Sequence, residues 1–243
     1  PDDLSARTKL LGYYFGTRPR SDEARQKQRG HVLWIIKNRP EAVILGLPYA
    51  GIDAILDPAG HQEAKKLWLE QIHAHPQSAT MLGSAAKFVV FSDKTLAEEL
   101  LKKAANLEPG DPQWPDQLGQ LYSLQSGVDS AAKALAEFEK AQAAEHEDIF
   151  KFYRLDKLAK AALKAGEVEK AAGYANESLK AAARFPKDWN HGNAIHHGNN
   201  VLGRIALKQG DLKLAADYLL KAGATPGSPQ LGSFGPNMSL AKE

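Results

Sequence analysis

Apolar side chains recur at three- and four-residue steps along most of this 243-residue chain. Steps of that size place apolar side chains on one stripe of an α-helix. The pattern is clearest in residues 201–222, where a Gly210-Asp211 pair divides it into two halves. Glycine favours the left-handed end of a helix, and aspartate caps the start of the next one. The segment therefore predicts two antiparallel helices joined by a tight turn.

Small residues recur along the chain at a longer interval. The alanines that stand 40, 33, 34, 40 and 44 residues apart are Ala24, Ala64, Ala97, Ala131, Ala171 and Ala215. A second set of small residues, each preceded by leucine, runs roughly a dozen residues ahead of most of them: Gly12, Gly83, Gly119, Ala159 and Gly203. Positions with almost no side chain let two helices approach closely. A period of this length, built from paired helices, predicts an all-α solenoid of helical hairpins.

The spacing divides the chain, taken as one solenoid domain over residues 1–243, into six units and a C-terminal cap. The approximate units are 1–40, 41–76, 77–110, 111–148, 149–190 and 191–226, and the cap is 227–243. Well-formed helices are expected at 22–38, at 62–74 and from Pro115 onward. Leu47-Pro48 and Gly51 interrupt the first half of the second unit, so 41–58 is expected to be short or irregular. After Pro226 we expect a loop and then a short helix that begins at Asn237.

The repeated residues resemble the tetratricopeptide repeat (TPR) family, whose units read W-x2-L-G-x2-Y and then G, A, F, A and P at fixed offsets. Trp114 with Leu118-Gly119 and Tyr122 comes close to this motif, with the tryptophan one residue out of register. The resemblance covers nearly the whole chain and is strongest in the last unit. The layout is also similar to uncharacterised bacterial TPR proteins that end in a TPGSPQLxSFGPNM segment. The resemblance implies an α–α superhelix with a C-terminal capping segment, no catalytic activity and no cofactor.

Composition narrows the function classes. Apolar residues make up 43% of the chain and charged residues 25%, which is ordinary for a folded protein. The 31 Lys+Arg and 29 Asp+Glu leave a net charge of +2, too balanced for a protein that binds nucleic acid through charge. Cysteine is absent, which removes disulfides, thiolate metal sites and thiol nucleophiles.

Location is left open by the sequence. No apolar run approaches the roughly 18 residues that a membrane-spanning helix needs. The chain begins at Pro1, so a signal peptide could have preceded it. A cytoplasmic location and a periplasmic or secreted one are both compatible with the residues, and the chain could continue past Glu243.

A partner-binding surface follows from the family resemblance. In that family the first helices of successive repeats line a concave groove that holds an extended peptide or a partner helix. The resemblance assigns these residues to the groove: Gln113, Asp116, Gln120, Tyr153, Asp156, Lys160, Lys164, His197, Asn200, Arg204 and Lys208.

The charges of two predicted helices favour an anionic partner. Lys160/Lys164 and Arg204/Lys208 are like-charged pairs four residues apart, which repel one another on a helix. They fall at matching offsets in adjacent units, so we expect them to project side by side as a basic strip. Such a strip would take a carboxylate terminus, an acidic peptide or a phosphate. The alternative is an ordinary solvated face, partly neutralised by an Asp156–Lys160 pair.

The most unusual composition lies in Asp188–Asn200, DWNHGNAIHHGNN, at the junction of a loop and a helix. Histidines with amide neighbours can bind a metal, hold a ligand carboxylate or transfer protons. Adjacent residues on a helix point about 100° apart, so His196 and His197 should not chelate one ion together. His191 would have to fold back from the loop. The alternative interpretation is that the asparagines cap the helix and its loop while the histidines pack between repeats.

Three functions follow from these patterns. The first is a scaffold that binds a peptide or protein segment in its groove. The second is a small-ligand, metal-binding or enzymatic protein that uses residues 188–200. The third is a solenoid that assembles with copies of itself through exposed end repeats. The sequence favours the first.

Overall fold

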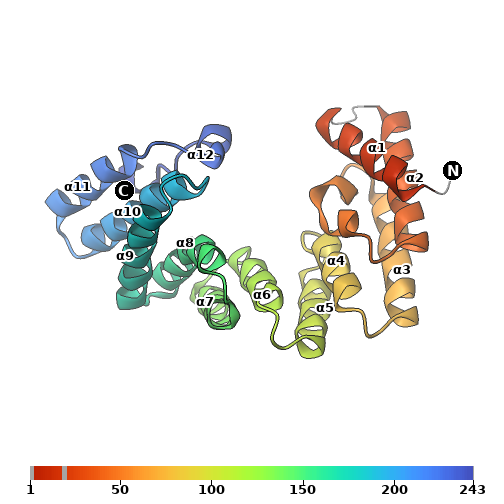
Figure 1. The fold of residues 1–243 in the computed structure, drawn as a ribbon, viewed down its shortest axis with the longest axis horizontal. Coiled ribbons are helices and arrows are strands. Elements are labelled where there is room, and N and C mark those ends of the chain that lie inside the picture. Colours follow the sequence, from red (N-terminus) through yellow and green to blue (C-terminus); the bar gives the residue numbers. More distant parts are fainter. Residues whose placement is uncertain (1–2, 18–20, 243) are drawn as a thin grey trace. The chain divides into compact units, whose positions relative to one another are not determined.

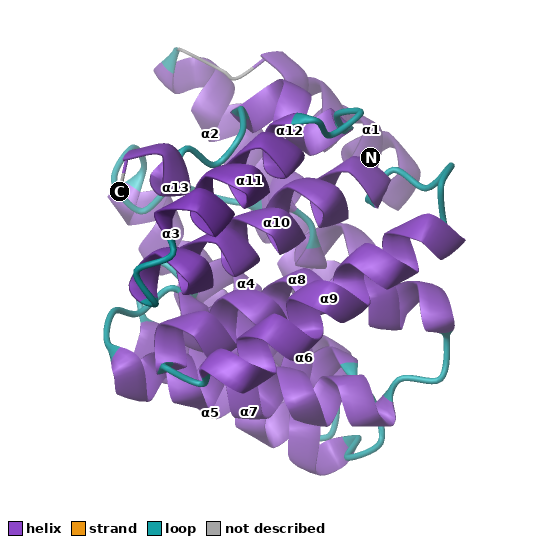
Figure 2. Ribbon diagram, turned by 90° about the vertical axis from the view of Figure 1, so that its left-hand side faces the viewer, coloured by secondary structure: helices purple, strands orange, loops and turns teal. Residues whose placement is uncertain are grey.

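The computed structural model describes residues 3–17 and 21–242, and every regular element in those ranges is a helix (Figures 1 and 2). Two compact units divide the chain, Pro1–Gly110 and Asp111–Glu243. Their boundary coincides with the predicted boundary between the third and fourth repeats, and the organisation as one domain stays a prediction. Each helix in the described ranges is too short or too polar to cross a bilayer.

The first unit is a series of helices in which each packs on the next. Its elements are α1 (Leu4–Thr17), α2 (Asp22–Asn38), the 3-10 turns η1 (Val43–Gly46) and η2 (Pro48–Ala50), α3 (Pro58–Ala74), α4 (Ala79–Val89) and α5 (Lys94–Leu107). The range of α2 is the predicted one. The irregular segment expected at 41–58 is confirmed, since two short turns replace a helix there.

The start of α3 differs from the prediction because a polar cap extends the helix. Helix α3 begins at Pro58 instead of residue 62, and the Asp57 carboxylate accepts a hydrogen bond from the Gly60 N–H at 3.0 Å. The same carboxylate pairs with Arg29 of α2 at 3.0 Å, which ties the cap to the preceding helix. In α1 the expected close contact at Gly12 is wrong, because Gly12 is exposed and no neighbour lies within 4 Å of a Cβ placed there.

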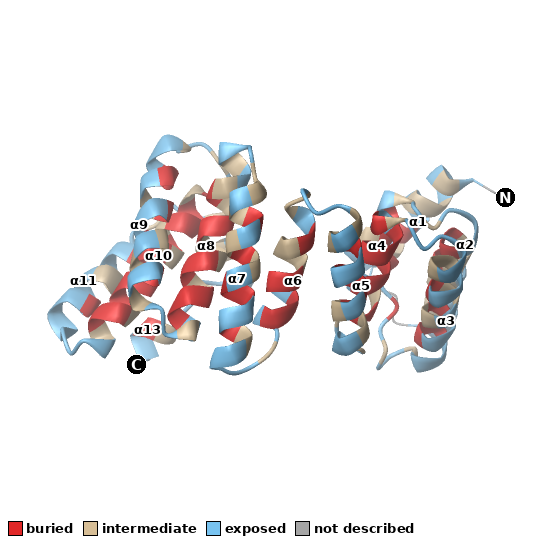
Figure 3. Ribbon diagram, turned by 90° about the horizontal axis from the view of Figure 1, so that it is seen from below, coloured by how far each residue is buried: buried red, intermediate tan, exposed pale blue. Residues whose placement is uncertain are grey.

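The second unit consists of three hairpins, α6–α7, α8–α9 and α10–α11, stacked in chain order. Their bounds are α6 (Gln113–Ser123), α7 (Val128–Ala144), α8 (Asp148–Ala165), α9 (Val168–Arg184), α10 (His191–Lys208) and α11 (Leu212–Gly223). Helix α8 also packs directly on α10, so the first helices of the last two hairpins are neighbours. Buried positions concentrate along α8 and α10 (Figure 3). The predicted all-α fold of consecutive hairpins is confirmed.

Small residues sit where these helices meet. Ala131, Ala171 and Ala215 are 5%, 0% and 5% exposed. A Cβ added at Gly119 of α6 would lie 2.6 Å from the ring of Phe138 on α7. The small side chains of the repeat pattern therefore mark contacts between paired helices in this unit, as the sequence predicts.

The tight turn predicted within residues 201–222 is confirmed. Gly210 has a φ of 82°, in the left-handed region that favours glycine. Asp211 then caps α11, since its carboxylate accepts a hydrogen bond from the Leu214 N–H at 2.9 Å. Helix α6 begins at Gln113, two residues before the expected Pro115, and the Asp111 carboxylate accepts the Gln113 N–H at 2.8 Å.

The C-terminal tail is more ordered than the sequence indicates. The loop expected after Pro226 contains a short helix, α12 (Pro229–Phe234), capped by Ser228, whose hydroxyl accepts the Leu231 N–H at 3.0 Å. Helix α13 (Ser239–Lys242) follows and packs on α10. Its Leu240 is 6% exposed and fills the space that Gly203 leaves free. The segment therefore covers part of the last hairpin.

Two glycine substitutions test the packing of the second unit. Gly119→Ala should destabilise the protein by about 1–3 kcal/mol, because the buried Phe138 ring must move. Gly173→Ala in α9 is the matched control: a Cβ there meets nothing within 4 Å, so the better helix propensity of alanine should stabilise by about 0.5–1 kcal/mol. Urea unfolding measures both values. Equal effects of the same sign at the two positions would contradict the close contact at Gly119.

Candidate functional site

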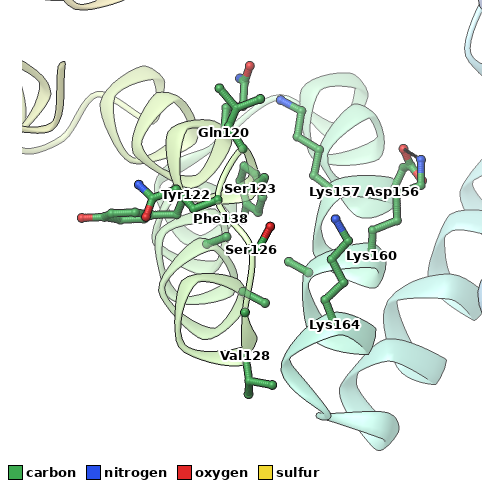
Figure 4. Close-up of a pocket in the computed structure, with 16 residues that line it drawn as sticks. Gln120, Tyr122, Ser123, Ser126, Val128, Phe138, Asp156, Lys157, Lys160 and Lys164 are labelled. Atoms are coloured by element: carbon green, nitrogen blue, oxygen red, sulfur yellow. Dashed lines mark hydrogen bonds and ion pairs between the residues drawn. The ribbon is translucent and has the colours of Figure 1, made fainter. Parts of the chain in front are cut away.

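A pocket of about 780 Å³ opens within the second unit, between α8 and the α6–α7 hairpin (Figure 4). Its apolar lining comes mainly from the end of α6, the start of α7 and one position of α8: Leu124, Val128, Ala131, Ala134, Phe138 and Ala161. Its charged lining comes from one helix, α8: Asp156, Lys157, Lys160 and Lys164. The pocket therefore combines an apolar surface with a row of ammonium groups.

The three lysines differ in how far they are already paired. Lys157 reaches toward α6 and contacts the Asp116 carboxylate at 2.8 Å, whereas Lys160 turns to Asp156 at 2.9 Å (Figure 4). Lys164 is exposed and forms no ion pair with the residues that the structure describes. Steps of three and four residues hold all three on one face of α8. The pocket thus keeps a net positive edge.

A buried arginine fixes the walls of the pocket. Arg154 of α8 is 7% exposed. Its guanidinium contacts the Asp116 carboxylate of α6 at 3.2 Å, the Gln142 amide oxygen of α7 at 3.2 Å and the Glu145 carboxylate after α7 at 3.4 Å. One side chain therefore joins three consecutive helices. Sequence analysis missed Arg154; an arginine on the apolar stripe of a helix, with carboxylates in the preceding unit, is the sign that would have indicated it.

The contact with Arg154 also affects the pKa of Glu145. Burial acts to raise the pKa of the Glu145 carboxyl, but the N–H of Glu147, the Arg154 guanidinium and the N–H of His146 together lower it below its usual value. The ionised form of Glu145 is therefore favoured in the folded protein. Its contribution to stability is present above the ordinary pKa of glutamate and is lost as the pH falls through the lowered value.

His197 of α10 belongs to a second polar group, between α8 and α10. Burial lowers the pKa of His197 to about 4, against a smaller opposing effect of the Asp156 carboxylate, and Lys160 adds to the lowering. Its Nδ1 atom and the Oδ1 atom of Asp156 are both buried without a hydrogen-bond partner among the described residues. The imidazole is therefore neutral near pH 7.

The structure places four predicted groove residues at the pocket: Gln120, Asp156, Lys160 and Lys164. Asp116 lies behind it, bound to Lys157, Arg154 and the Gln120 amide. Gln113 is exposed at the start of α6. Arg204 and Lys208 lie on α10, outside the pocket lining. That they project beside Lys160 and Lys164 stays a prediction.

Two predicted groove residues are used within the fold. The Tyr153 hydroxyl donates to Asp188 at 2.8 Å and accepts from the Trp189 indole N–H at 3.0 Å. Asn200 is 4% exposed, and its amide NH2 group lies 2.8 Å from the His196 carbonyl oxygen. The expectation that Asn200 faces an open groove is therefore corrected, because its amide is buried against the preceding turn of α10.

The His/Asn-rich segment, residues 188–200, binds other parts of the same chain. His191 is the first residue of α10 and not a loop residue as expected, and its Nδ1 lies 2.9 Å from the Ala182 carbonyl oxygen of α9. His196 Nδ1 lies 3.1 Å from the Ala222 carbonyl oxygen of α11. The His191 contact joins two successive repeats, as the alternative interpretation expects, whereas the His196 contact lies within the α10–α11 hairpin. No group of three or more possible metal-ligating side chains occurs in the described ranges.

The same segment also holds the tail, which the sequence did not indicate. The Thr225 hydroxyl donates to the Gly192 carbonyl oxygen at 2.7 Å, and the Ser228 hydroxyl donates to the Asn193 amide oxygen at 2.5 Å. The Asn237 N–H donates to His196 Nε2 at 3.0 Å. The His/Asn-rich segment and the C-terminal tail therefore bind each other, through hydrogen bonds between residues 33 to 41 positions apart.

Comparison with known proteins adds likeness of fold alone. No family model matches the chain, and no curated protein matches it. Among solved structures, the chain is similar to one described as the functional characterization of Pseudomonas aeruginosa pilF, at 17% identity and a TM-score of 0.44, over 86% of this chain and 97% of that one. It is also similar to the APC/C hetero-tetramer Cut9–Hcn1, at 14% identity and a TM-score of 0.37, over 88% of this chain and 52% of that one. The chain thus spans about half the length of the second protein. The fold described above rests on the helix packing itself.

Replacing Arg154 should weaken the second unit strongly. Arg154→Met removes the guanidinium from the Glu145 and Asp116 carboxylates, whose side chains are 11% and 15% exposed, which we expect to cost about 3 kcal/mol in urea unfolding. Arg184→Met is the matched control, because its pair with Asp148 is more than half exposed on both sides and should contribute less than about 1 kcal/mol. A loss no larger than that of the control would show that Arg154 does not hold the three helices together.

The titration of His197 tests the electrostatics between α8 and α10. Since the pKa of His197 is lowered from 6.5 to about 4, its stabilising contribution is complete above pH 6.5 and is lost as the pH falls toward 4. In an NMR titration Asp156→Asn should lower this pKa further, and Lys160→Gln should raise it. A folded protein in which His197 titrates at its ordinary value would contradict the burial of the ring.

Proposed function

We propose that the second unit is a non-catalytic protein-interaction module that binds a segment of a partner protein in the pocket along α8. The segment recognised would carry an acidic group, a side-chain or C-terminal carboxylate, next to an apolar side chain. The observation that carries this proposal is the pocket itself, where Lys157, Lys160 and Lys164 border an apolar surface.

The two parts of the pocket would contribute differently to binding. Burying one large aliphatic or aromatic side chain is worth about 1.5–3 kcal/mol. A partly exposed lysine–carboxylate pair contributes only about 0.2–1 kcal/mol. Apolar contact with Phe138 and its neighbours would therefore supply most of the affinity, and the lysines would select which segment binds.

Lys164 is the cation best placed to meet an incoming carboxylate. It is exposed and has no ion pair among the described residues, whereas Lys157 and Lys160 are held by Asp116 and Asp156. A second acidic group on the segment would replace Asp156 as the ion-pair partner of Lys160. Both pairs are partly exposed, so binding should weaken as ionic strength rises.

The walls of the pocket are ordered before any partner arrives. Arg154 joins α8 to α6 and to the end of α7, and Lys157 adds a second link from α8 to Asp116. A preformed site loses less conformational entropy on binding. This favours recognition of a short segment by a rigid surface.

Helix α10 would extend the site. It packs directly on α8 and carries Arg204 and Lys208 at the offsets of Lys160 and Lys164. A partner with a second acidic cluster could span both helices, with His197 between them. We include these residues as the distal part of the proposed surface.

Self-association through the C-terminal end is the second candidate. The apolar side chains that are most exposed in this region are Leu212 at 69%, Leu220 at 74% and Phe234 at 89%. A second copy could cover them, as the sequence-based hypothesis of stacked end repeats requires. Light scattering of the full chain over a concentration series tests this candidate separately from peptide binding.

Selection from a library of random displayed peptides, with the full chain as bait, tests the proposed function. We expect enrichment of segments that combine an acidic group with large apolar residues. Lys160→Glu/Lys164→Glu should reduce binding of the selected peptides at least tenfold, because it reverses two charges at the pocket edge. Fluorescence anisotropy of a labelled selected peptide gives the dissociation constants.

A matched charge change elsewhere provides the control. Lys180→Glu/Lys213→Glu alters the net charge equally on exposed positions of α9 and α11, and should leave peptide binding within about twofold. Arg204→Glu/Lys208→Glu reports whether α10 takes part. Equal binding by the wild type and the Lys160/Lys164 variant, or selected peptides without acidic residues, would refute the pocket as the binding site.

A further inference from the structure

The tail of residues 224–242 is held along one stripe of α10. The α10 residues that contact it are Gly192, Asn193, His196 and Gly203. Their spacing places them on one side of the helix. At Gly192 the fit leaves no room for a side chain, because a Cβ there would overlap the Gly227 carbonyl group. The stripe is therefore a surface shaped to its own tail.

His196 lies in the middle of this stripe, and its hydrogen bonds specify its protonation state. Its Nδ1 faces the Ala222 carbonyl oxygen at 3.1 Å, and a carbonyl oxygen only accepts, so Nδ1 carries the proton. Its Nε2 faces the Asn237 N–H at 3.0 Å and the Asn200 side-chain NH2 at 3.2 Å. Both of these groups donate, so Nε2 must present its lone pair. The arrangement requires a neutral imidazole.

Few other contacts hold the tail close to Asn237. Phe234 and Met238, on either side of it, are 89% and 50% exposed. Leu240 is the apolar side chain of the tail that is buried, against Gly203. The hydrogen bond from Asn237 to His196 therefore lies between the α12 contacts and this single apolar anchor.

The charged and titratable groups around His196 are few. The ring of His197 meets it edge-on at 5.1 Å between centroids. From α8, Asp156 and Lys160 act on His197. From α9, the contacts on α10 are made by the uncharged Ala175, Leu179 and Ala182. From α11, Lys221 is bound to Asp217 and lies over Tyr218, and from the tail α13 carries Lys242.

We propose that His196 is a proton-operated latch for the C-terminal tail. When the ring is neutral, Nε2 accepts the Asn237 N–H and the tail covers the α10 stripe. When the ring takes up a proton, its Nε2–H points at two N–H donors and no lone pair remains to accept them. The tail then leaves the stripe. Release takes up a proton, so it is favoured as the pH falls.

Release would uncover a second surface of the second unit. The groups set free are the Asn193 amide, the Gly192 carbonyl oxygen and the apolar space at Gly203. These groups lie outside the lining of the lysine pocket, so the latch does not depend on the function proposed for that pocket. The latch makes access to the α10 stripe depend on pH.

Amide hydrogen exchange of the full chain between pH 7.5 and 5.5 tests the latch. Protection is expressed as the intrinsic exchange rate at each pH divided by the observed rate. Release takes up one proton, so the protection of Asn237 and of residues 228–240 should fall as the pH is lowered, by up to about tenfold per pH unit. His196→Gln cannot take up a proton and should remove this pH dependence. His197→Gln should keep it, since the pKa of His197, about 4, lies below the range tested.

Two further measurements keep the outcome decisive. Gly192→Ala should detach the tail at every pH, because the added Cβ overlaps the Gly227 carbonyl group. It therefore shows the exchange rates of the released tail. Nitrogen-15 NMR of the wild type should show His196 with its proton on Nδ1 at pH 7.5, independently of any variant. Protection of the tail that is unchanged down to pH 5.5, the same pH dependence in His196→Gln, or a proton on Nε2 at pH 7.5 would each overturn the proposal.

Discussion

Two helices approach most closely where one of them presents almost no side chain, and three glycines of the second unit provide such positions. Gly119 admits the Phe138 ring, Gly198 admits Leu179, and Gly203 admits Leu240. Each contact involves a glycine in the first helix of a hairpin. The first contact lies within the α6–α7 hairpin beside the pocket, the second joins α10 to α9 of the preceding hairpin, and the third lies on the α10 stripe under the tail. The two candidate sites therefore depend on the packing that the small residues permit.

Polar residues at neighbouring offsets in this unit differ in how far they are used within the fold. Arg154, Tyr153 and Asn200 bind their own chain. Lys160 is partly exposed and paired with Asp156, and Lys164 is exposed. A helix of this kind carries both types of residue at neighbouring offsets, so the repeat pattern alone does not tell them apart. The structure separates them by the helices that surround each side chain.

The sequence predicted the hairpins because their causes are local. Helix α2 begins after its cap residue Ser21 and ends before Pro40. The Gly210-Asp211 pair turns the chain because glycine accepts the left-handed conformation and aspartate caps α11. The predictions failed where the cause lies far along the chain. The site of Arg154 depends on Asp116, and the ordering of α12 depends on Asn193, and neither pairing leaves a periodic trace. The pocket was anticipated in part, since Lys160 and Lys164 stand at groove offsets, but its apolar side comes from α7, which the groove assignment did not include.

The three-way contact of Arg154 has a consequence for the motions of the protein. In a stack of hairpins each element touches mainly its neighbours, so segments can open one at a time with a cost set by local contacts. A guanidinium shared by α6, the end of α7 and α8 opposes such separate openings, because detaching any one helix strands buried charge on the others. These three helices should therefore behave as one cooperative folding unit.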